Sequence, residues 1–246
     1  MNTVIAGISG GIGLALASRL LGRDPNAVIL GIARNASNHP GACQLQKEHS
    51  KRLHLVDTDV TQPQDLRDLG QTIPPGSEIR RIIYAIGVLH DEHMFPEKRL
   101  EDIDPQEMMR SYQVNTLGFL LLTRTLIPWL RHRQPKLIAA ISAKVGSIGD
   151  NGFGGWYSYR CSKAALNMAI RNLAIETHRR MKPAIVVALH PGTTQTRLSE
   201  PFQQSLARLP VHTPGDTATN LWQVMDNLTP EDSGAFFSWD GNRIPW

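Results

Sequence analysis

The chain opens with a glycine-rich turn between an apolar run and a helical pattern. Residues Asn2–Ser9 form the apolar run, and a helix is expected over Gly11–Leu21. Gly7, Gly11 and Gly13 let the backbone turn tightly, because no Cβ obstructs it. A buried strand that turns at once into a helix is typical of a βαβ unit, so this feature favours a sheet whose strands are joined through helices.

The same alternation continues to the end of the chain. Further strands are expected over Ala27–Ala33, Leu53–Asp57, Arg81–Ile86, Lys136–Ser142, Ala184–Leu189 and Ala235–Trp239. Further helices are expected over Pro63–Thr72, Asp104–Arg131, Gly155–Arg180 and from Thr213-Pro214 to about Asn227. The strand Ala27–Ala33 is continuously apolar, as in a parallel sheet that is covered on both faces. The pattern predicts an α/β fold, a Rossmann-type doubly wound parallel sheet with helices on both faces.

Length and composition suit one globular domain. The 246 residues contain no internal repeat and no linker, so residues 1–246 are expected to form a single domain. No run of 18 apolar residues occurs, and no membrane span is predicted. The cysteines Cys43 and Cys161 lie far apart without metal-ligand spacing, which favours free thiols and a cytoplasmic protein.

The charged residues argue against two classes of function. The net charge of +4 is small and the basic residues are scattered, so nucleic acid is not an expected partner. His90 and His93 lie three residues apart in an expected loop. No third histidine is near them, so no metal site is predicted and the loop is interpreted as polar surface.

The glycine turn has the chemistry of a dinucleotide site. A helix that begins directly after such a turn offers free N–H groups and a partial positive charge to a pyrophosphate. The residues expected to line the site are Gly7, Ser9, Gly11, Ile12 and Gly13. The spacing G-x-x-x-G-x-G is only moderately specific, and glycines that merely make a tight turn are the alternative.

Two positions after later strands refine this prediction. An acidic residue after the second strand would accept hydrogen bonds from the ribose of NAD, but Ala33 and Arg34 stand there. A guanidinium suits a 2′-phosphate, so NADP(H) is favoured over NAD(H), with a solvated surface arginine as the alternative. Asp59 and Val60 follow the third strand, where the carboxylate would accept from the adenine amine or else form a turn or helix cap.

Tyr159 and Lys163 carry the strongest catalytic signal. Residues four apart share one face of a helix, and a lysine ammonium would lower the pKa of a neighbouring tyrosine. Such a tyrosine exchanges a proton near neutral pH. Together with a dinucleotide site, the pair indicates hydride transfer at a carbonyl or alcohol. Tyr157 lies two residues earlier and is interpreted as a substrate-pocket or packing aromatic.

With these motifs in order, the chain resembles the short-chain dehydrogenase/reductase family over nearly its whole length. Gly7, Gly11 and Gly13 match its glycine motif, with Ala6 in place of the usual threonine, and Tyr159 and Lys163 match Tyr-x-x-x-Lys. The remaining matches are Asp59 with the adenine-contacting aspartate, Asn115 with the asparagine of the catalytic tetrad, and Pro191-Gly192 with Thr194 and Thr196, which resemble the segment that holds the nicotinamide carboxamide. More narrowly, Ser142–Ile148, Gly155–Arg160 and Ile244–Trp246 resemble the branch of C-factor proteins and sniffer-type carbonyl reductases.

The chain departs from the family pattern in two places. The family's Asn-Asn-Ala-Gly reads Tyr84-Ala-Ile-Gly87 here, and altered packing is expected, with Gly87 retained beside the cofactor. Counting from Gly146, the usual catalytic serine falls on Ala143, and Ser142 lies one residue before it. Ser142 is favoured as the catalytic serine, followed by Ser147; the third alternative has no serine, with Asn115 or water in its place.

The resemblance implies reversible hydride transfer between NADP(H) and a carbonyl or alcohol substrate. Tyr159 would be the general acid/base, and Lys163 would lower its pKa and bond the nicotinamide ribose. Ser142 would hold the substrate oxygen, while Asn115 would kink its helix and help a water relay to Lys163.

Two other functions stay open at this point. The first is a C-factor-like signalling or regulatory protein that binds a dinucleotide without significant turnover. The second is a methyltransferase, which Arg34 and the Tyr159–Lys163 pair disfavour. Specificity is expected from Pro191–Val211, interpreted as a lid, and from Phe153–Tyr157, with Leu198, Phe202 and Leu206 as an apolar wall. The resemblance also implies a homodimer or homotetramer.

Overall fold

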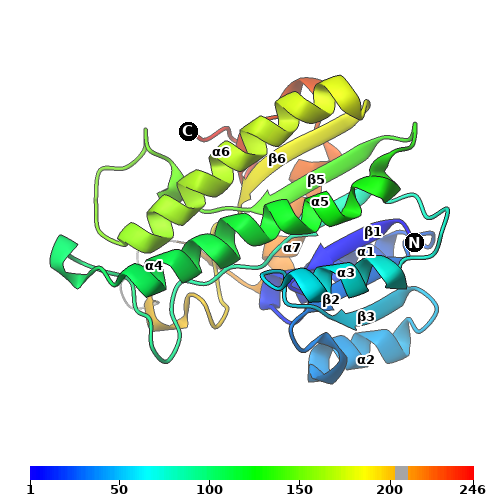
Figure 1. Cartoon of the computed structure of the whole chain (residues 1–246), viewed down its shortest axis with the longest axis horizontal. Helices are drawn as coiled ribbons and strands as arrows, with labels where there is room; N and C mark the ends of the chain where they lie inside the picture. Colours follow the sequence, from blue (N-terminus) through cyan, green and yellow to red (C-terminus); the bar gives the residue numbers. More distant parts are fainter. Residues whose placement is uncertain (203–209) are drawn as a thin grey trace.

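The computed structural model describes residues 1–202 and 210–246, and its centre is a seven-stranded sheet (Figure 1). The strand order is β3-β2-β1-β4-β5-β6-β9, and neighbouring strands are parallel throughout. The strands are β1 (Thr3–Ala6), β2 (Ile29–Ala33), β3 (Leu53–Asp57), β4 (Arg81–Tyr84), β5 (Lys136–Ile141), β6 (Ala184–His190) and β9 (Phe236–Ser238). The predicted doubly wound parallel sheet is confirmed.

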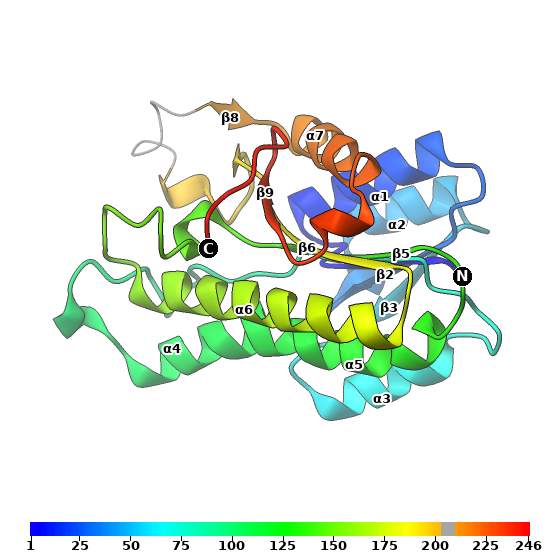
Figure 2. The ribbon, with the colours of Figure 1, turned by 90° about the horizontal axis from the view of Figure 1, so that it is seen from above.

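Helices cover both faces of the sheet, as Figure 2 shows from above. One face carries α1 (Gly11–Arg23), α2 (Pro40–Glu48) and α7 (Pro214–Asp226); the other carries α3 (Pro63–Thr72), α4 (Pro105–Tyr112), α5 (Gly118–Leu130) and α6 (Tyr157–Arg180). Alternate strand residues enter alternate layers, so Val4 packs in the layer of α3, α5 and α6, while Ile5 packs in the layer of α1, α2 and α7.

Two helices differ from the sequence prediction. The expected helix Asp104–Arg131 is divided by a π-helical segment, Gln113–Leu117, between α4 and α5. The second difference is α2, which was not predicted because it buries only Ala42 and Leu45 and so has little apolar periodicity. It begins at Pro40, and the His39 side chain accepts a hydrogen bond from the N–H of Ala42.

The sheet order reverses between β1 and β4, and this reversal locates the site. In doubly wound sheets, ligands bind outside the carboxyl ends of the strands at such a reversal. A two-stranded parallel sheet of β7 (Thr193–Thr194) and β8 (Val211–His212), also absent from the prediction, follows the carboxyl end of β6. In the described part of the chain, no helix is long and apolar enough to cross a membrane.

Candidate active site

The glycine turn after β1 is packed too tightly for side chains. Gly7 has φ +93°, and a Cβ placed on it would lie 2.8 Å from the carbonyl carbon and oxygen of Ala85 after β4. A Cβ on Gly13 would lie 2.1 Å from the carbonyl oxygen of Gly7. The turn therefore folds back on itself and against β4, which keeps the backbone of its outer side open to a ligand.

The first turn of α1 forms a cradle that fits a phosphate. Its N-cap is Gly10, which has no side chain to bond the helix amides. A Cβ on Gly11 would lie 3.0 Å from Cγ2 of Thr196, so the segment after β6 reaches this turn. Ser9 is partly exposed beside the turn, whereas Ile12 packs partly against the core. Free amides and the helix dipole at one open point suit the pyrophosphate of a dinucleotide.

The adenosine end of the expected site is formed by loops after β2 and β3. Arg34 is exposed directly after β2. Asp59 has a turn role, because its Oδ1 accepts from the N–H of Thr61 at 2.9 Å and from Oγ1 of Thr61 at 2.7 Å. Val60 is buried, and a Cβ on Gly118 would lie 2.7 Å from its Cγ2. The amine-accepting role of Asp59 stays a prediction.

Asn115 lies in the π-helical segment and connects three parts of the molecule. Its Oδ1 accepts from the N–H of Val88 at 2.8 Å, and its Nδ2 donates to the carbonyl oxygen of Val88 at 2.9 Å. Nδ2 also donates to Oγ of Ser162 on α6 at 2.9 Å. The side chain is fully buried, so these bonds fix α4–α5 against the loop after β4 and against α6.

Tyr84 replaces the usual asparagine and supports the same segment. Its hydroxyl donates to the carbonyl oxygen of Val114 at 2.6 Å, and its ring packs edge-on against Phe119. Burial raises the pKa of Tyr84, so the hydroxyl stays protonated and keeps donating. Tyr84 therefore supports the π-helical segment from β4, and a difference from the family's packing stays a prediction.

Lys163 lies among Gly87, Asn115 and Tyr159, and these four residues are called the reaction cluster below. Its ammonium donates to the carbonyl oxygen of Ile141 at 2.9 Å and lies 5.7 Å from the ring centroid of Tyr159. A Cβ on Gly87 would lie 3.5 Å from Nζ of Lys163 and 3.4 Å from Oδ1 of Asn115. The structure therefore brings Gly87, Asn115, Tyr159 and Lys163 together at the carboxyl ends of β4 and β5.

Burial changes the acidity of both members of the pair. It lowers the pKa of Lys163 to about 7, because the charged ammonium is removed from water. It raises the pKa of Tyr159 for the corresponding reason, since the tyrosinate would be the charged form. The expected lowering of the tyrosine pKa by Lys163 is thus not found in this structure, where burial shifts the pKa of Tyr159 in the opposite direction.

The candidate serines point elsewhere. Ser142 is buried, and its hydroxyl donates to Oδ1 of Asn167 at 2.6 Å. Asn167 lies eight residues beyond Tyr159 on α6, about 12 Å along the helix axis. Ser147 is also buried and donates to the carbonyl oxygen of Pro245 at 2.6 Å. Neither hydroxyl is directed at Tyr159 in this geometry.

Ala143, by contrast, packs beside Tyr159. Residues of β5 alternate between the two layers, and Ile138 and Ala140 face the layer that contains α6. Ser142 continues that set, which explains why its hydroxyl meets Asn167 of α6. Ala143 follows, and it contacts the small cluster around Tyr159.

The segment after β6 is held by a close contact at Gly192 and by hydrogen bonds at Thr194 and Thr196. Gly192 has φ +72°, and a Cβ on it would lie 2.8 Å from Cδ1 of Trp239. Pro191 and Thr194 are buried, and the Thr194 hydroxyl pairs with that of Thr217 at 2.8 Å. The N–H of Thr196 donates to Oγ of Ser199 at 3.1 Å. The segment thus runs from the end of β6 to the glycine turn.

An apolar wall stands next to Tyr159. Leu89 and Phe202 pack with Tyr159, and the partly buried side chains against them are Ala143, Val145, Trp156 and Leu198. The rings of Trp156 and Phe202 lie 4.9 Å apart between centroids. Leu89 was not anticipated from the sequence, since its short loop has no periodic pattern, whereas Trp156 lies in the segment Phe153–Tyr157 from which specificity was expected. Leu206 lies outside the described residues.

The histidine loop belongs to the same region. Nε2 of His90 lies 3.1 Å from the carbonyl oxygen of Arg197, and its ring packs edge-on against Phe202. The backbone N–H of His93 donates to Asp91. Within residues 1–202 and 210–246, no three His, Cys, Asp or Glu side chains are grouped as metal ligands would be.

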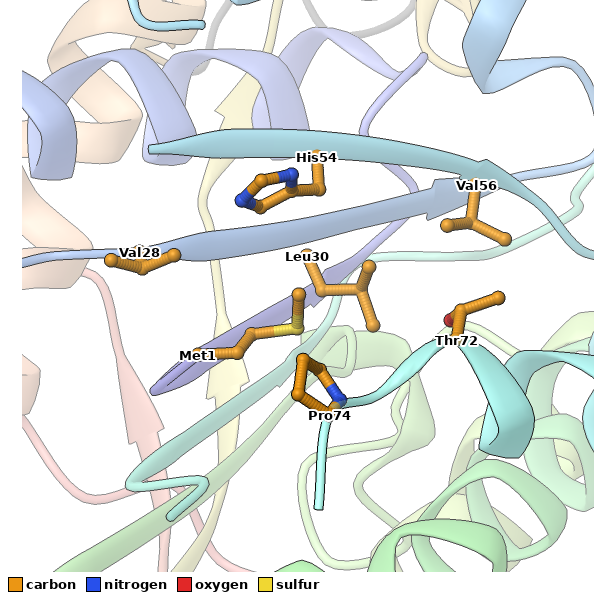
Figure 3. Close-up of a pocket in the computed structure, with 7 residues that line it drawn as sticks. All are labelled: Met1, Val28, Leu30, His54, Val56, Thr72 and Pro74. Carbon is orange, nitrogen blue, oxygen red and sulfur yellow. The ribbon is translucent and has the colours of Figure 1, made fainter. Parts of the chain in front are cut away.

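Two surface hollows lie away from this cluster. Figure 3 shows one of about 240 Å³ against β2 and β3, lined by Met1, Val28, Leu30, His54, Val56, Thr72 and Pro74. The other, of about 460 Å³, lies where α5 and α6 end, and its basic lining includes Arg131, Arg133, Arg180 and Lys182. Cations are ordinarily favoured at helix carboxyl ends. Neither hollow is lined by Gly87, Asn115, Tyr159 or Lys163.

Comparison with known families agrees with this geometry. The family model described as short chain dehydrogenase matches residues 2–207. The chain therefore belongs to the short-chain dehydrogenase family, a family of oxidoreductases.

Individual relatives agree with the expected branch. The chain is 39% identical to C-signal of Myxococcus xanthus over 147 residues, which is 60% of this chain and 83% of that protein. It superposes on NADPH-bound carbonyl reductase from chicken fatty liver with a TM-score of 0.87 and 28% identity, covering 100% of this chain and 98% of the other. The carbonyl reductase Sniffer of D. melanogaster has the same fold, with a TM-score of 0.87, 23% identity and 100% and 99% coverage.

Proposed function

We propose that the protein is an NADPH-dependent reductase of carbonyl substrates, and that the reaction is reversible. The observation that carries the proposal is the cluster of Asn115, Tyr159 and Lys163 at the strand ends beside an open glycine turn. In this cluster a buried proton donor and a buried amine lie next to a site that fits a dinucleotide.

Tyr159 is the proposed general acid. Its raised pKa keeps the hydroxyl protonated at neutral pH, which is the form needed to protonate an alkoxide during reduction. Lys163, with a pKa of about 7, exchanges protons at the working pH and resupplies the tyrosine. Asn115 holds the helix segment and the loop after β4 in register, so that the donor and the amine keep their positions.

The residues of the glycine turn hold the dinucleotide in this proposal. NADPH, when bound, supplies the hydride. The amides at the start of α1 bind its pyrophosphate, and Arg34 binds the 2′-phosphate through its planar guanidinium. Pro191, Gly192, Thr194 and Thr196 form the segment at the nicotinamide end. The NADPH named with the chicken carbonyl reductase supports this coenzyme.

The substrate oxygen is bound without a serine hydroxyl. Ser142 and Ser147 use their hydroxyls on Asn167 and on Pro245, and Ala143 occupies the position beside Tyr159. Tyr159 itself, with water, then holds the oxygen. Leu89, Trp156 and Phe202 pack beside Tyr159, and these side chains suit a substrate with an apolar body next to its carbonyl.

The reaction is tested with Tyr159→Phe. The variant lacks the transferable proton, and kcat for NADPH-dependent reduction of an apolar aldehyde or ketone should fall on the order of 10²–10⁴-fold. NADPH binding, followed by fluorescence, should change by less than about twofold, because the glycine turn is untouched. Unchanged turnover in the variant would remove Tyr159 from the mechanism.

A dinucleotide-binding regulatory protein is the second candidate, favoured by the similarity to C-signal. The NADPH titration, combined with an assay of carbonyl turnover, separates the two functions. NADPH binding with no turnover of any carbonyl in a broad panel would support the regulatory function. Turnover that is lost in Tyr159→Phe would support the reductase.

A further inference from the structure

A carboxylate is buried at the start of the catalytic helix. Glu97 lies in the loop after β4 and is only 5% exposed. Both of its carboxylate oxygens accept from the N–H of Ser158 at 3.2 Å, and the Ser158 hydroxyl donates to Oε1 as well. Ser158 is the second residue of α6, and Tyr159 follows it directly.

One helix amide and one hydroxyl, both of Ser158, rather than a cation, bond this carboxylate. The ion pairs found among residues 1–202 and 210–246 do not include Glu97. A buried carboxylate is costly unless it is bonded, and the amino end of a helix supplies both N–H donors and a favourable dipole. The loop residue therefore acts as the missing N-terminal cap of α6, across 61 residues of sequence.

The approach to α6 needs such an anchor. Gly154, Gly155 and Trp156 all have positive φ, at +67°, +63° and +52°. Trp156 is the N-cap, it has no side-chain capping bond, and a left-handed conformation is unfavourable for so large a residue. Its N–H donates to the backbone carbonyl oxygen of Glu97 at 2.5 Å. Glu97 thus holds the strained turn with its main chain and the helix with its side chain.

Both contacts of Glu97, the main-chain bond to Trp156 and the side-chain bonds to Ser158, involve residues next to Tyr159. Trp156 and Tyr159 have ring centroids 6.3 Å apart, and Trp156 also packs against Phe202. Phe95, two residues before Glu97, packs against Phe202 from the same loop. We propose that Glu97 is the positioning residue of Tyr159, which sets the depth and direction of the catalytic hydroxyl through the first turn of α6; this rests on the proposed function of Tyr159.

The test compares Glu97→Ala with Glu97→Gln, and Glu101→Ala is the control because Glu101 is an exposed carboxylate of the same loop. Glu97→Ala should lower kcat by about 10- to 100-fold, the effect of a displacement of about 1 Å. NADPH affinity should stay within about twofold, since the glycine turn is distant in the fold. Glu97→Gln keeps an acceptor for Ser158 and should recover kcat to within about fivefold of the parent, a loss no larger than that of one hydrogen bond.

Amide hydrogen exchange gives a readout that does not depend on turnover. Exchange at the Ser158 amide, which bonds Glu97, should accelerate in Glu97→Ala and stay slow in Glu101→Ala. Accelerated exchange in a protein whose parent turns over no carbonyl would refute the proposed function and leave the anchoring of α6 intact. Unchanged exchange and kcat in Glu97→Ala would overturn the positioning role, as would equal losses in kcat and NADPH affinity.

A second variant keeps the proposal testable if Glu97→Ala does not fold. Ser158→Ala removes only the hydroxyl and leaves the amide bonds to Glu97. It should lower kcat by about threefold to tenfold, the cost of one hydrogen bond, with NADPH affinity retained. Full kcat in Ser158→Ala would contradict a role for this contact in placing Tyr159.

Discussion

The glycine turn and the reaction cluster are built at different ranges of sequence. Gly7 and Gly13 contact each other within one turn of chain, and side chains are excluded there by the backbone itself. The cluster depends on distant partners: Asn115 bonds Val88, and Lys163 bonds the carbonyl oxygen of Ile141. The role of a local motif can therefore be predicted from its spacing in the sequence. For a long-range cluster, the sequence shows only which residue types are available, not which of them come together.

The largest expected effect tests the local side of this comparison. In Gly13→Ala the new Cβ would meet the carbonyl oxygen of Gly7 at 2.1 Å, which the turn cannot accommodate without moving. We expect a loss of about 1–3 kcal/mol in the free energy of unfolding, as for other overpacked sites. NADPH affinity should fall more than about 100-fold, because the displaced turn is the proposed pyrophosphate cradle. Urea unfolding and fluorescence titration measure the two quantities.

Gly22 supplies the matched control in the same helix. A Cβ placed on Gly22 has no atom within 4 Å, so Gly22→Ala adds a methyl group to open space. Alanine is favoured over glycine inside a helix, and a gain of up to about 1 kcal/mol is expected with unchanged NADPH binding. Equal behaviour of the two variants would mean that the turn is not set by local packing.

The reaction cluster differs from the glycine turn in having a buried amine, that of Lys163, so its effect on stability depends on pH. Lys163 has a pKa of about 7 in the folded protein, against 10.5 as the ordinary value. Below pH 7 the amine is charged in both the folded and the unfolded state, and the cost of burying it is fully present. Between pH 7 and 10.5 the folded state binds fewer protons than the unfolded state, so stability gains up to about 1.4 kcal/mol per pH unit from this group.

Lys163→Met should therefore remove this slope. Without NADPH, the variant is expected to be more stable than the parent at pH 6–7, with the difference shrinking as the pH approaches 10. Thermal unfolding across this range measures the slope. Lys182→Met is the control, since Lys182 is exposed and its loss removes no buried charge. Parallel curves for Lys163→Met and the parent would show that the amine is not buried as a charge.

Much of this molecule could be predicted from its sequence, and the misses have physical reasons. Continuous apolar strands and a glycine turn are local signals, so the parallel sheet was predicted. The resemblance implied a kink at Asn115, but the apolar pattern of Asp104–Arg131 gave no sign of the π-helical segment, which Asn115, Tyr84 and Thr116 hold through bonds to other elements. Tyr159 and Lys163 were located by spacing, but burial, not their mutual attraction, determines their pKa values. Glu97 had no signal at all, since its partner lies 61 residues away.

The smallest expected effects concern Ala143 and Ser142, the two neighbouring candidates for the position of the catalytic serine. Ala143 contacts the cluster of Tyr159, and its side chain is one hydroxyl short of the residue that the family motif has at this position. Ala143→Ser places a donor beside Tyr159, and kcat for carbonyl reduction should rise about threefold to tenfold, the worth of one neutral hydrogen bond in the transition state. KM should change little, because the apolar side chains beside Tyr159 are unaltered.

Ser142→Ala decides which of the two neighbouring residues serves the reaction. Its hydroxyl bonds Asn167 in the layer of α6, so its loss should cost about 1 kcal/mol in stability and leave kcat within about twofold. In the reverse result, Ser142→Ala would abolish catalysis and Ala143→Ser would have no effect. That result would mean that the end of β5 rotates when NADPH and substrate bind, so that the Ser142 side chain then faces Tyr159. The reaction cluster would then be set by its ligands, and the contrast with the preformed glycine turn would be sharper still.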